Sequence, residues 1–233
     1  MATVTIHRKN PGGSGETFLL DLAVAAESLQ KRGVLPGAFG YDRAAHLFRT
    51  LQAEGSDPVD LLPAAYPTSW MVNSKASSRT FVQWALMEET WRSVFDVLKF
   101  DRSLEEWRKL DASDRERVAK DVTALATAPG ATLVAVTKVL TLLVPQLVPL
   151  MDDAAIHWAI GTVADPTTAD DPKAGPEQFL PMMDWFAEET ARSESGLIEL
   201  ARGHELAVLD APQVLDRILW FESWGRKLLK GGS

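Results

Sequence analysis

The sequence contains no cysteine among its 233 residues. This absence excludes disulfide frameworks, zinc sites built on cysteine, iron–sulfur clusters and thiol catalysis. Basic side chains are also in the minority, because 24 Lys and Arg stand against 32 Asp and Glu, which gives a formal net charge of −8. A protein that binds phosphate backbones needs a basic surface. Nucleic acid is therefore not the expected partner.

Long uninterrupted hydrophobic runs are missing as well. The most apolar stretch, Val122 to Met151, is interrupted by proline and glycine and carries Lys138 near its middle. This pattern favours a pair of buried helices over a membrane span. The first 15 residues lack the apolar segment of a secretion signal. We therefore expect a cytoplasmic, soluble protein with no membrane association.

Strand patterns are nearly absent, since only Thr3 to His7 alternates between polar and apolar residues. Elsewhere apolar residues recur at three and four positions, as they do on one face of a helix. The expected helices are Phe18–Arg32, Tyr41–Ala53, Ser78–Leu98, a helix opened by the capping box Ser113-x-x-Glu116 and ending near Ala126, Leu133–Val144, Asp153–Ile160, Pro181–Ala201 and Pro212–Leu229. The prediction is an all-α, single globular multi-helix domain of about eight helices over residues 1–230. Gly231–Ser233 resembles an added tail and is not counted in this domain.

Two segments between the expected helices are predicted to be loops. The segment Gly55–Ser77 is long for a compact helical domain, and such loops often carry function. The segment Ala164–Pro176 is rich in proline and aspartate, which indicates an exposed connector.

The first candidate site lies where the long loop meets the Ser78 helix. A helix N-terminus presents unpaired N–H groups and a partial positive charge, so it favours anions. The residues expected to hold a small anionic ligand there are Ser74, Lys75, Ser77, Ser78 and Arg79, with Tyr66 and Trp70 as aromatic walls. The alternative is that Ser77 or Ser78 only caps the helix, while Lys75 and Arg79 remain solvated.

The second candidate is Lys138, a lone cation in an otherwise uncharged helix. Such a lysine must extend to solvent, pair with a carboxylate or act with a shifted pKa. Asp152 and Asp153 begin the next helix, so a pair with either of them is the natural expectation. A catalytic role as amine nucleophile or base for these three residues is the alternative.

No cofactor or metal is expected. The pair Asp153-x-x-x-His157 places two possible metal ligands on one helical face, but no third ligand follows at a suitable spacing. A Gly-rich phosphate loop, a dinucleotide fingerprint and a nucleophile elbow are all missing from the sequence.

Tryptophan is abundant, with eight residues against two tyrosines. Core packing explains most tryptophans in helices, but a Trp-lined groove also binds apolar ligands or a partner helix. A protein partner is therefore the alternative to a small ligand.

Residues 125–160 resemble the helix-hairpin-helix DNA glycosylases. In that family a hairpin leads to a lysine-bearing helix, and a proline step, an aspartate and a Trp-containing helix follow. The matching features here are Pro129-Gly130, Thr137-Lys138-Val139, Pro145, Val148-Pro149, Asp152/Asp153 and His157-Trp158. The resemblance implies that Lys138 is the amine nucleophile and that Asp152 or Asp153 is the catalytic aspartate. The family's second hairpin glycine is absent.

The same stretch, together with Leu215–Phe221, is similar to an uncharacterised actinobacterial domain family. That similarity implies architecture and no activity. From Pro129 onward the chain has 8 Lys and Arg against 15 Asp and Glu, which opposes contact with DNA. Three functions therefore stay open. They are a protein that binds or transforms a small anionic metabolite, a helical interaction subunit, and a glycosylase-like enzyme.

Overall fold

The computed structural model describes residues 3–9, 15–21, 35–72, 76–160, 173–203 and 211–220. Its elements are β1 (Thr3–Lys9), β2 (Gly15–Asp21), α2 (Leu35–Ala53), α3 (Pro58–Thr68), the 3-10 helix η1 (Ser69–Val72), α4 (Ser78–Ala85), α5 (Glu88–Val97), α6 (Leu104–Trp107), α7 (Ala112–Ala126), α8 (Leu133–Leu143), α9 (Asp153–Ile160), the 3-10 helix η2 (Pro176–Gln178), α10 (Phe179–Gly203) and α11 (Ala211–Trp220). The predicted all-α class is confirmed, with one two-stranded hairpin added to it. No helix within these residues is long and apolar enough to cross a bilayer.

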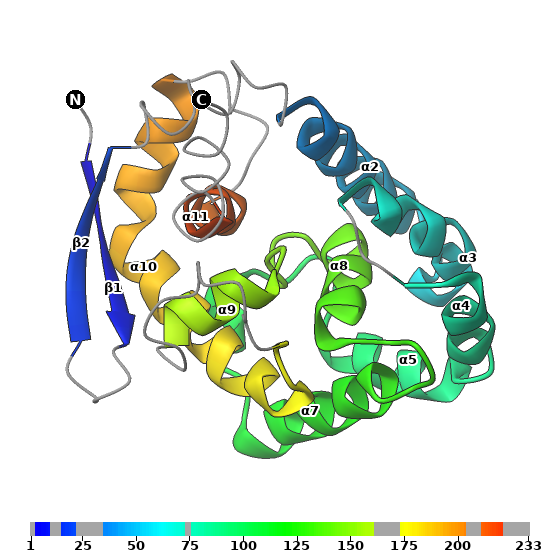
Figure 1. Ribbon diagram of the computed structural model, residues 1–233. Coiled ribbons are helices and arrows are strands. Elements are labelled where there is room, and N and C mark those ends of the chain that lie inside the picture. Colours follow the sequence, from blue (N-terminus) through cyan, green and yellow to red (C-terminus); the bar gives the residue numbers. More distant parts are fainter. Residues whose placement is uncertain are drawn as a thin grey trace, which may run out of the picture.

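Helix α8 lies at the centre of the molecule, and each of its residues is buried. It packs against α2, α3 and α7. Figure 1 shows α2, α3 and α4 on one side of α8, and α9, α10 and the hairpin on the other side. A single cluster of buried apolar side chains extends through these layers, from Ile6 to Leu219. Burial of this continuous cluster stabilises the fold.

The hairpin pairs β1 with β2 in antiparallel register, with Ile6 opposite Phe18. Strand β1 packs against α9 and α10, and Ile6 is fully buried. The predicted helix Phe18–Arg32 is therefore wrong over residues 18–21, while residues 22–32 lie outside the described part. An apolar run as short as Phe18–Leu20 carries no period that separates helix from strand. Pairing with β1 gives this segment its strand conformation.

Several predicted helices are confirmed at their ends. Helix α2 ends at Ala53, as expected, and Gly55 follows with φ 102°. This left-handed backbone conformation favours glycine. Helices α7, α8 and α9 end within one residue of the predicted positions. The capping box at Ser113 is wrong, because Asp111 caps α7 by accepting the Asp114 amide at 2.8 Å.

The predicted helix Ser78–Leu98 is two helices, α4 and α5, separated at Leu86 and Met87. Trp84 and Trp91 are both fully buried, and their rings meet edge to face at 5.9 Å. Trp84 also donates from Nε1 to the Leu125 carbonyl at 2.8 Å. Both indoles therefore lie in the same part of the core, one on each side of the break.

The predicted loop Gly55–Ser77 is also wrong, because it contains α3 and η1. Asp57 caps α3 by accepting the Val59 amide at 2.8 Å, and Pro58 occupies the first turn. Two further prolines lie inside the helix and argue against it locally. Burial of one apolar face of α3 compensates for them. Most of the predicted connector Ala164–Pro176 lies outside the described residues.

Helices α10 and α11 begin as predicted, with Pro181 and Pro212 in their first turns. The described part of α11 ends at Trp220, so the predicted continuation to Leu229 lies outside it. Helix α6 was not predicted, although the Glu106 carboxylate accepts the Ser103 amide at 2.8 Å at its start.

Candidate functional site

The N-terminus of α4 is closed by a reciprocal cap. The Ser77 hydroxyl accepts the Thr80 amide at 3.2 Å, and the Thr80 hydroxyl accepts the Ser77 amide at 3.2 Å. Ser77, Ser78 and Arg79 are all exposed. Ser77 therefore caps α4, as one of the two interpretations expects. Ser74 and Lys75 lie outside the described residues, so their place in an anion site stays a prediction.

A tight turn lies against this helix end. Gly130 has φ 78°, and a Cβ built on it would lie 2.9 Å from the Thr80 hydroxyl. The same hydroxyl lies 3.4 Å from the Pro129 carbonyl. Glycine at this position thus permits both the left-handed backbone and the close approach. Two features that the sequence analysis treated separately, the Pro129-Gly130 turn and the α4 cap, meet in space.

The two predicted aromatic walls have different environments. Tyr66 is buried and stacks on Phe81 with ring centroids 5.1 Å apart. Burial raises the pKa of the Tyr66 hydroxyl above its ordinary value. Trp70 is half exposed, and the centroid of its ring lies 5.3 Å from that of Phe81. Its Nε1 donates to the Ala76 carbonyl at 2.7 Å. Tyr66 therefore belongs to the core, and Trp70 belongs to the surface.

Trp70 is one of several exposed apolar side chains on α2, η1, α4 and the residue that follows α4. The large hydrophobic residues that are exposed among the described residues are Leu47 (57%), Trp70 (50%), Met71 (50%), Val82 (59%) and Leu86 (78%). We call these five residues the Trp70 face. The Met71 side chain lies against Gly40 of α2, where a Cβ would approach its Cε to 2.6 Å. Scattered apolar residues are ordinary on a surface, but grouped ones often mark an interaction site.

The elements that carry the Trp70 face hold a single carboxylate, which is that of Asp42. Asp42 is buried, and Arg217 from α11 binds both of its oxygens at 2.7 and 2.8 Å. The exposed arginines of α2 and α4 are Arg43 and Arg79. Exposed residues of both charge signs lie near these five side chains in the sequence, because Glu54 follows α2, and Glu88 and Glu89 follow Leu86.

Asp42 and Arg217 belong to a buried ionic triad that the sequence analysis missed. Arg217 also binds the Asp216 carboxylate at 3.1 Å, and that carboxylate accepts the Leu150 amide at 3.0 Å. Burial raises the pKa of Asp216 to about 7, although Arg217 opposes this shift. Burial acts to lower the pKa of Arg217, but the Asp216 and Asp42 carboxylates raise it above its ordinary value.

The triad joins α2, α11 and the segment before α9. Tyr41, next to Asp42, is fully buried and donates its hydroxyl to the Lys138 carbonyl. Burial raises the pKa of Tyr41 well above its ordinary value, so the hydroxyl remains a donor. A signal for the triad exists in the sequence, because Asp216-Arg217 interrupts an otherwise apolar segment. Only the fold shows that Asp42 completes it.

Lys138 has 4% of its surface exposed and lies within the central helix. Asp153 accepts the Ala174 amide at 2.8 Å, and Asp152 is half-buried. The predicted pair between Lys138 and one of these aspartates stays a prediction. A nucleophilic amine must reach its substrate, so this burial does not favour the catalytic role implied by the glycosylase resemblance.

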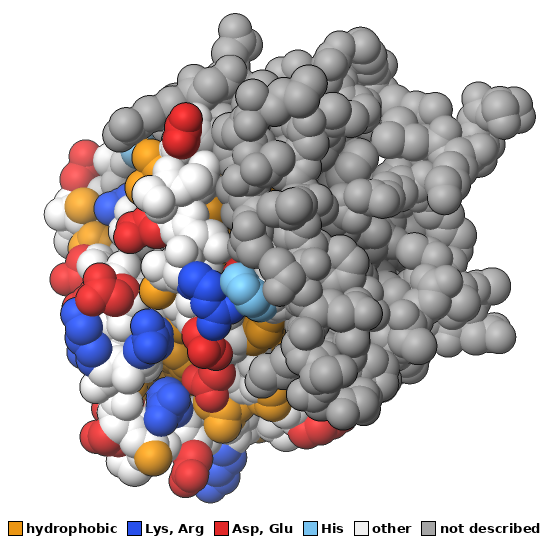
Figure 2. Space-filling model, turned by 90° about the vertical axis from the view of Figure 1, so that its left-hand side faces the viewer, with side chains coloured by type: hydrophobic (Ala, Val, Ile, Leu, Met, Phe, Trp, Pro, Cys, Tyr) orange, Lys and Arg blue, Asp and Glu red, His pale blue; other side chains and the backbone are white. Residues whose placement is uncertain are grey.

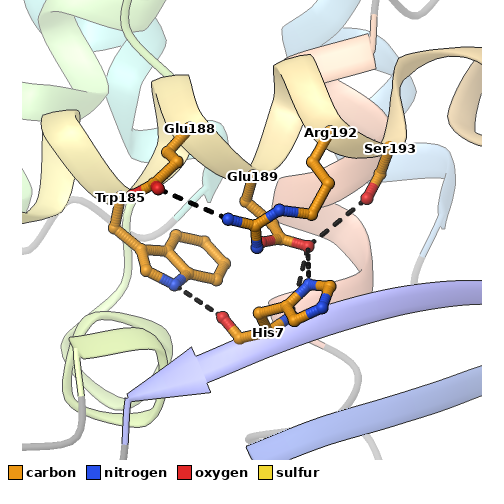
Figure 3. A network of polar contacts seen from close by, with 6 residues as sticks. All are labelled: His7, Trp185, Glu188, Glu189, Arg192 and Ser193. Carbon is orange, nitrogen blue, oxygen red and sulfur yellow. Dashed lines mark hydrogen bonds and ion pairs between the residues drawn. The ribbon is translucent and has the colours of Figure 1, made fainter. Parts of the chain in front are cut away.

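A second polar network fastens the hairpin to α10 (Figure 3). The buried Glu189 carboxylate accepts the His7 amide at 3.1 Å and contacts the His7 ring at 3.2 Å. Arg192 and Ser193 contact the same carboxylate at 2.7 and 3.3 Å. Trp185 completes the network by donating to the His7 carbonyl at 2.8 Å. Together the contacts of His7 join β1 to α10.

The surface beside the hairpin differs from the Trp70 face. Figure 2 shows acidic and basic side chains interspersed over the described part of this surface, with small apolar areas between them. Within the described residues, no group of three or more His, Asp or Glu side chains is placed to hold a metal ion. The Trp70 face is therefore the candidate site.

Comparison with protein-family models, with curated proteins and with solved structures found no match. The glycosylase resemblance accordingly stays a prediction that rests on residues 125–160 alone.

Proposed function

We propose that this chain is a protein-interaction subunit that docks a segment of a partner protein on the Trp70 face. One observation carries the proposal: the exposed large hydrophobic side chains of the described residues all lie on α2, η1 and the α4 segment. Removing such side chains from water contributes about 25 cal/mol per Å² of apolar area. An apolar centre with a polar border is the usual composition of a protein interface.

The environment of Trp70 supports an anchoring role. Its Nε1–H is already bound to the Ala76 carbonyl, and its ring rests on Phe81. The exposed half of the indole is thus held in place before a partner arrives. A fixed side chain loses little conformational entropy on binding, and tryptophan is enriched among residues that dominate binding energy.

A small anionic ligand at the α4 N-terminus has less support. Ser77 and Thr80 satisfy each other's amides, and the Gly130 turn lies against Thr80. Tyr66 is buried and does not border open space. Arg79 remains available, and its exposed guanidinium suits a carboxylate at the border of a protein interface.

Site-specific photocrosslinking in living cells tests the proposal. A benzophenone side chain is placed at Val82 on the Trp70 face and, as a matched control, at Ala124, which is exposed on α7. The crosslinked protein is then purified, and its dissociation constant is measured for the wild type, Val82→Asp and Ala124→Asp. We expect crosslinks from position 82 only, and at least tenfold weaker binding for Val82→Asp alone. Equal crosslinking at both positions, or equal binding by both variants, refutes the proposal.

A further inference from the structure

We propose that the triad of Asp42, Asp216 and Arg217 is a proton-operated latch that holds α11 against α2, and that opening of this latch releases one proton. The inference is independent of the proposed interaction function. Asp42 lies on α2, and Asp216 and Arg217 lie on α11. The two aspartates are 7% and 3% exposed, and the arginine side chain is 12% exposed.

The charges of the triad do not balance. Two carboxylates share one guanidinium, so the triad carries a net charge of −1 when both carboxyls are ionised and no net charge when one of them holds a proton. An uncompensated charge in the protein interior is strongly unfavourable. The closed triad therefore favours the protonated form, whereas a carboxyl that opens to water releases its proton. A rise in pH accordingly favours the open latch.

The geometry places this proton on Asp216. Arg217 binds both oxygens of Asp42 at 2.7 and 2.8 Å, but it binds one oxygen of Asp216, at 3.1 Å. Two short contacts with a guanidinium stabilise an ionised carboxylate more than one longer contact does. Burial raises the pKa of Asp216 to about 7, which agrees with this placement.

The surroundings of Asp216 set the direction of the effect. Within the described residues, Arg217 acts to keep Asp216 ionised, and Asp42 opposes ionisation. The Tyr41 hydroxyl also faces the triad from α2, and burial raises its pKa so far that it stays protonated. The other buried or half-buried titratable groups on α8, α9, α10 and the segment before α9 are Lys138, Asp152, Asp153, His157, Asp184 and Glu189. None of these described groups is among the causes that shift the pKa of Asp216.

The Leu150 amide reports directly on the latch. It lies in the segment before α9, outside any helix, and it donates to the Asp216 carboxylate at 3.0 Å. When Asp216 leaves the triad, this amide loses its hydrogen bond and exchanges with solvent. The Leu104 amide is a matched control. It donates to the Gln146 carbonyl, also at 3.0 Å, and this acceptor does not titrate.

Amide hydrogen exchange of the full-length chain, followed by NMR between pH 4 and 8, tests the inference. The measured rate of each amide is divided by its intrinsic rate at the same pH, so that the remaining change reflects opening. The variants are Asp216→Asn, which keeps an oxygen acceptor for the Leu150 amide, and Asp42→Asn. The control variant is Asp114→Asn, because Arg117 binds Asp114 at 2.9 Å on the surface of α7.

We expect the protection of the Leu150 amide in the wild type to fall about tenfold per pH unit between pH 4 and 7, and to level off above pH 7. The protection of the Leu104 amide should change much less. Asp216→Asn should abolish the pH dependence at Leu150. Asp42→Asn should reduce it, because one guanidinium then serves one carboxylate. Asp114→Asn should leave it unchanged.

Three results overturn the inference. The first is protection of the Leu150 amide that does not depend on pH. The second is a parallel change at Leu150 and Leu104, which means that the whole fold opens and not the latch. The third is a pH dependence that persists in Asp216→Asn. If Asp216→Asn does not fold, the comparison of the two amides in the wild type and the result for Asp42→Asn still decide the question.

Discussion

Replacing Asp216 with asparagine should change how the stability of the protein depends on pH. Asp216 is 3% exposed, and burial raises its pKa to about 7 from an ordinary value of 3.8. The folded protein therefore holds a proton on this carboxyl between pH 4 and 7, whereas the unfolded chain releases it. Stability contributed by this group must fall as the pH rises through that window.

The size of the effect follows from the shift in pKa. A difference of about three pH units corresponds to about 4 kcal/mol, since each unit is worth about 1.4 kcal/mol. Asparagine has nearly the same shape and can still accept the Leu150 amide, but it does not titrate. The free energy of unfolding of the wild type, relative to Asp216→Asn, should therefore decrease by about 4 kcal/mol between pH 4 and 8.

Urea denaturation followed by tryptophan fluorescence at each pH measures this difference. Asp101→Asn serves as the control, because Asp101 is exposed and lies far from the triad in sequence. The difference in unfolding free energy between Asp101→Asn and the wild type should change little with pH. The reasoning is refuted if the unfolding free energy of the wild type, relative to Asp216→Asn, stays constant or grows as the pH rises. Growth would mean that Arg217 holds Asp216 ionised in the fold.

Three further predictions concern packing and local conformation. Gly130→Ala should destabilise the protein more than Gly55→Ala does in thermal unfolding. Both glycines have positive φ, and a left-handed residue other than glycine costs about 1–2 kcal/mol. Of these two glycines, only Gly130 also has an atom within 3 Å of the added Cβ. Glu189→Gln should lower stability by about 1–3 kcal/mol and speed hydrogen exchange at the His7 amide, which Glu189 accepts; unchanged exchange would contradict this. Val82→Asp should change the unfolding free energy by less than about 0.5 kcal/mol, since the side chain is 59% exposed; a larger loss would show that Val82 supports the core.

The sequence alone determined the helical class and most helix ends. The period of apolar residues placed α8 and α9, and Gly55 marked the end of α2, because these signals act within a few residues of the chain. The same local signals failed for Phe18–Leu20, for the continuous Ser78–Leu98 helix and for the segment that forms α3. In each case a partner distant in sequence decided the conformation.

The tertiary structure alone decided which side chains form the candidate site. Trp70 and Tyr66 are four residues apart and both aromatic, yet one is half exposed and the other is buried against Phe81. The sequence likewise does not show that Arg217 binds the Asp42 carboxylate. Burial and charge balance depend on contacts between different elements, and Asp42 and Arg217 are 175 residues apart. Composition and helical period carry no information about such contacts, so the Trp70 face became visible only in the folded chain.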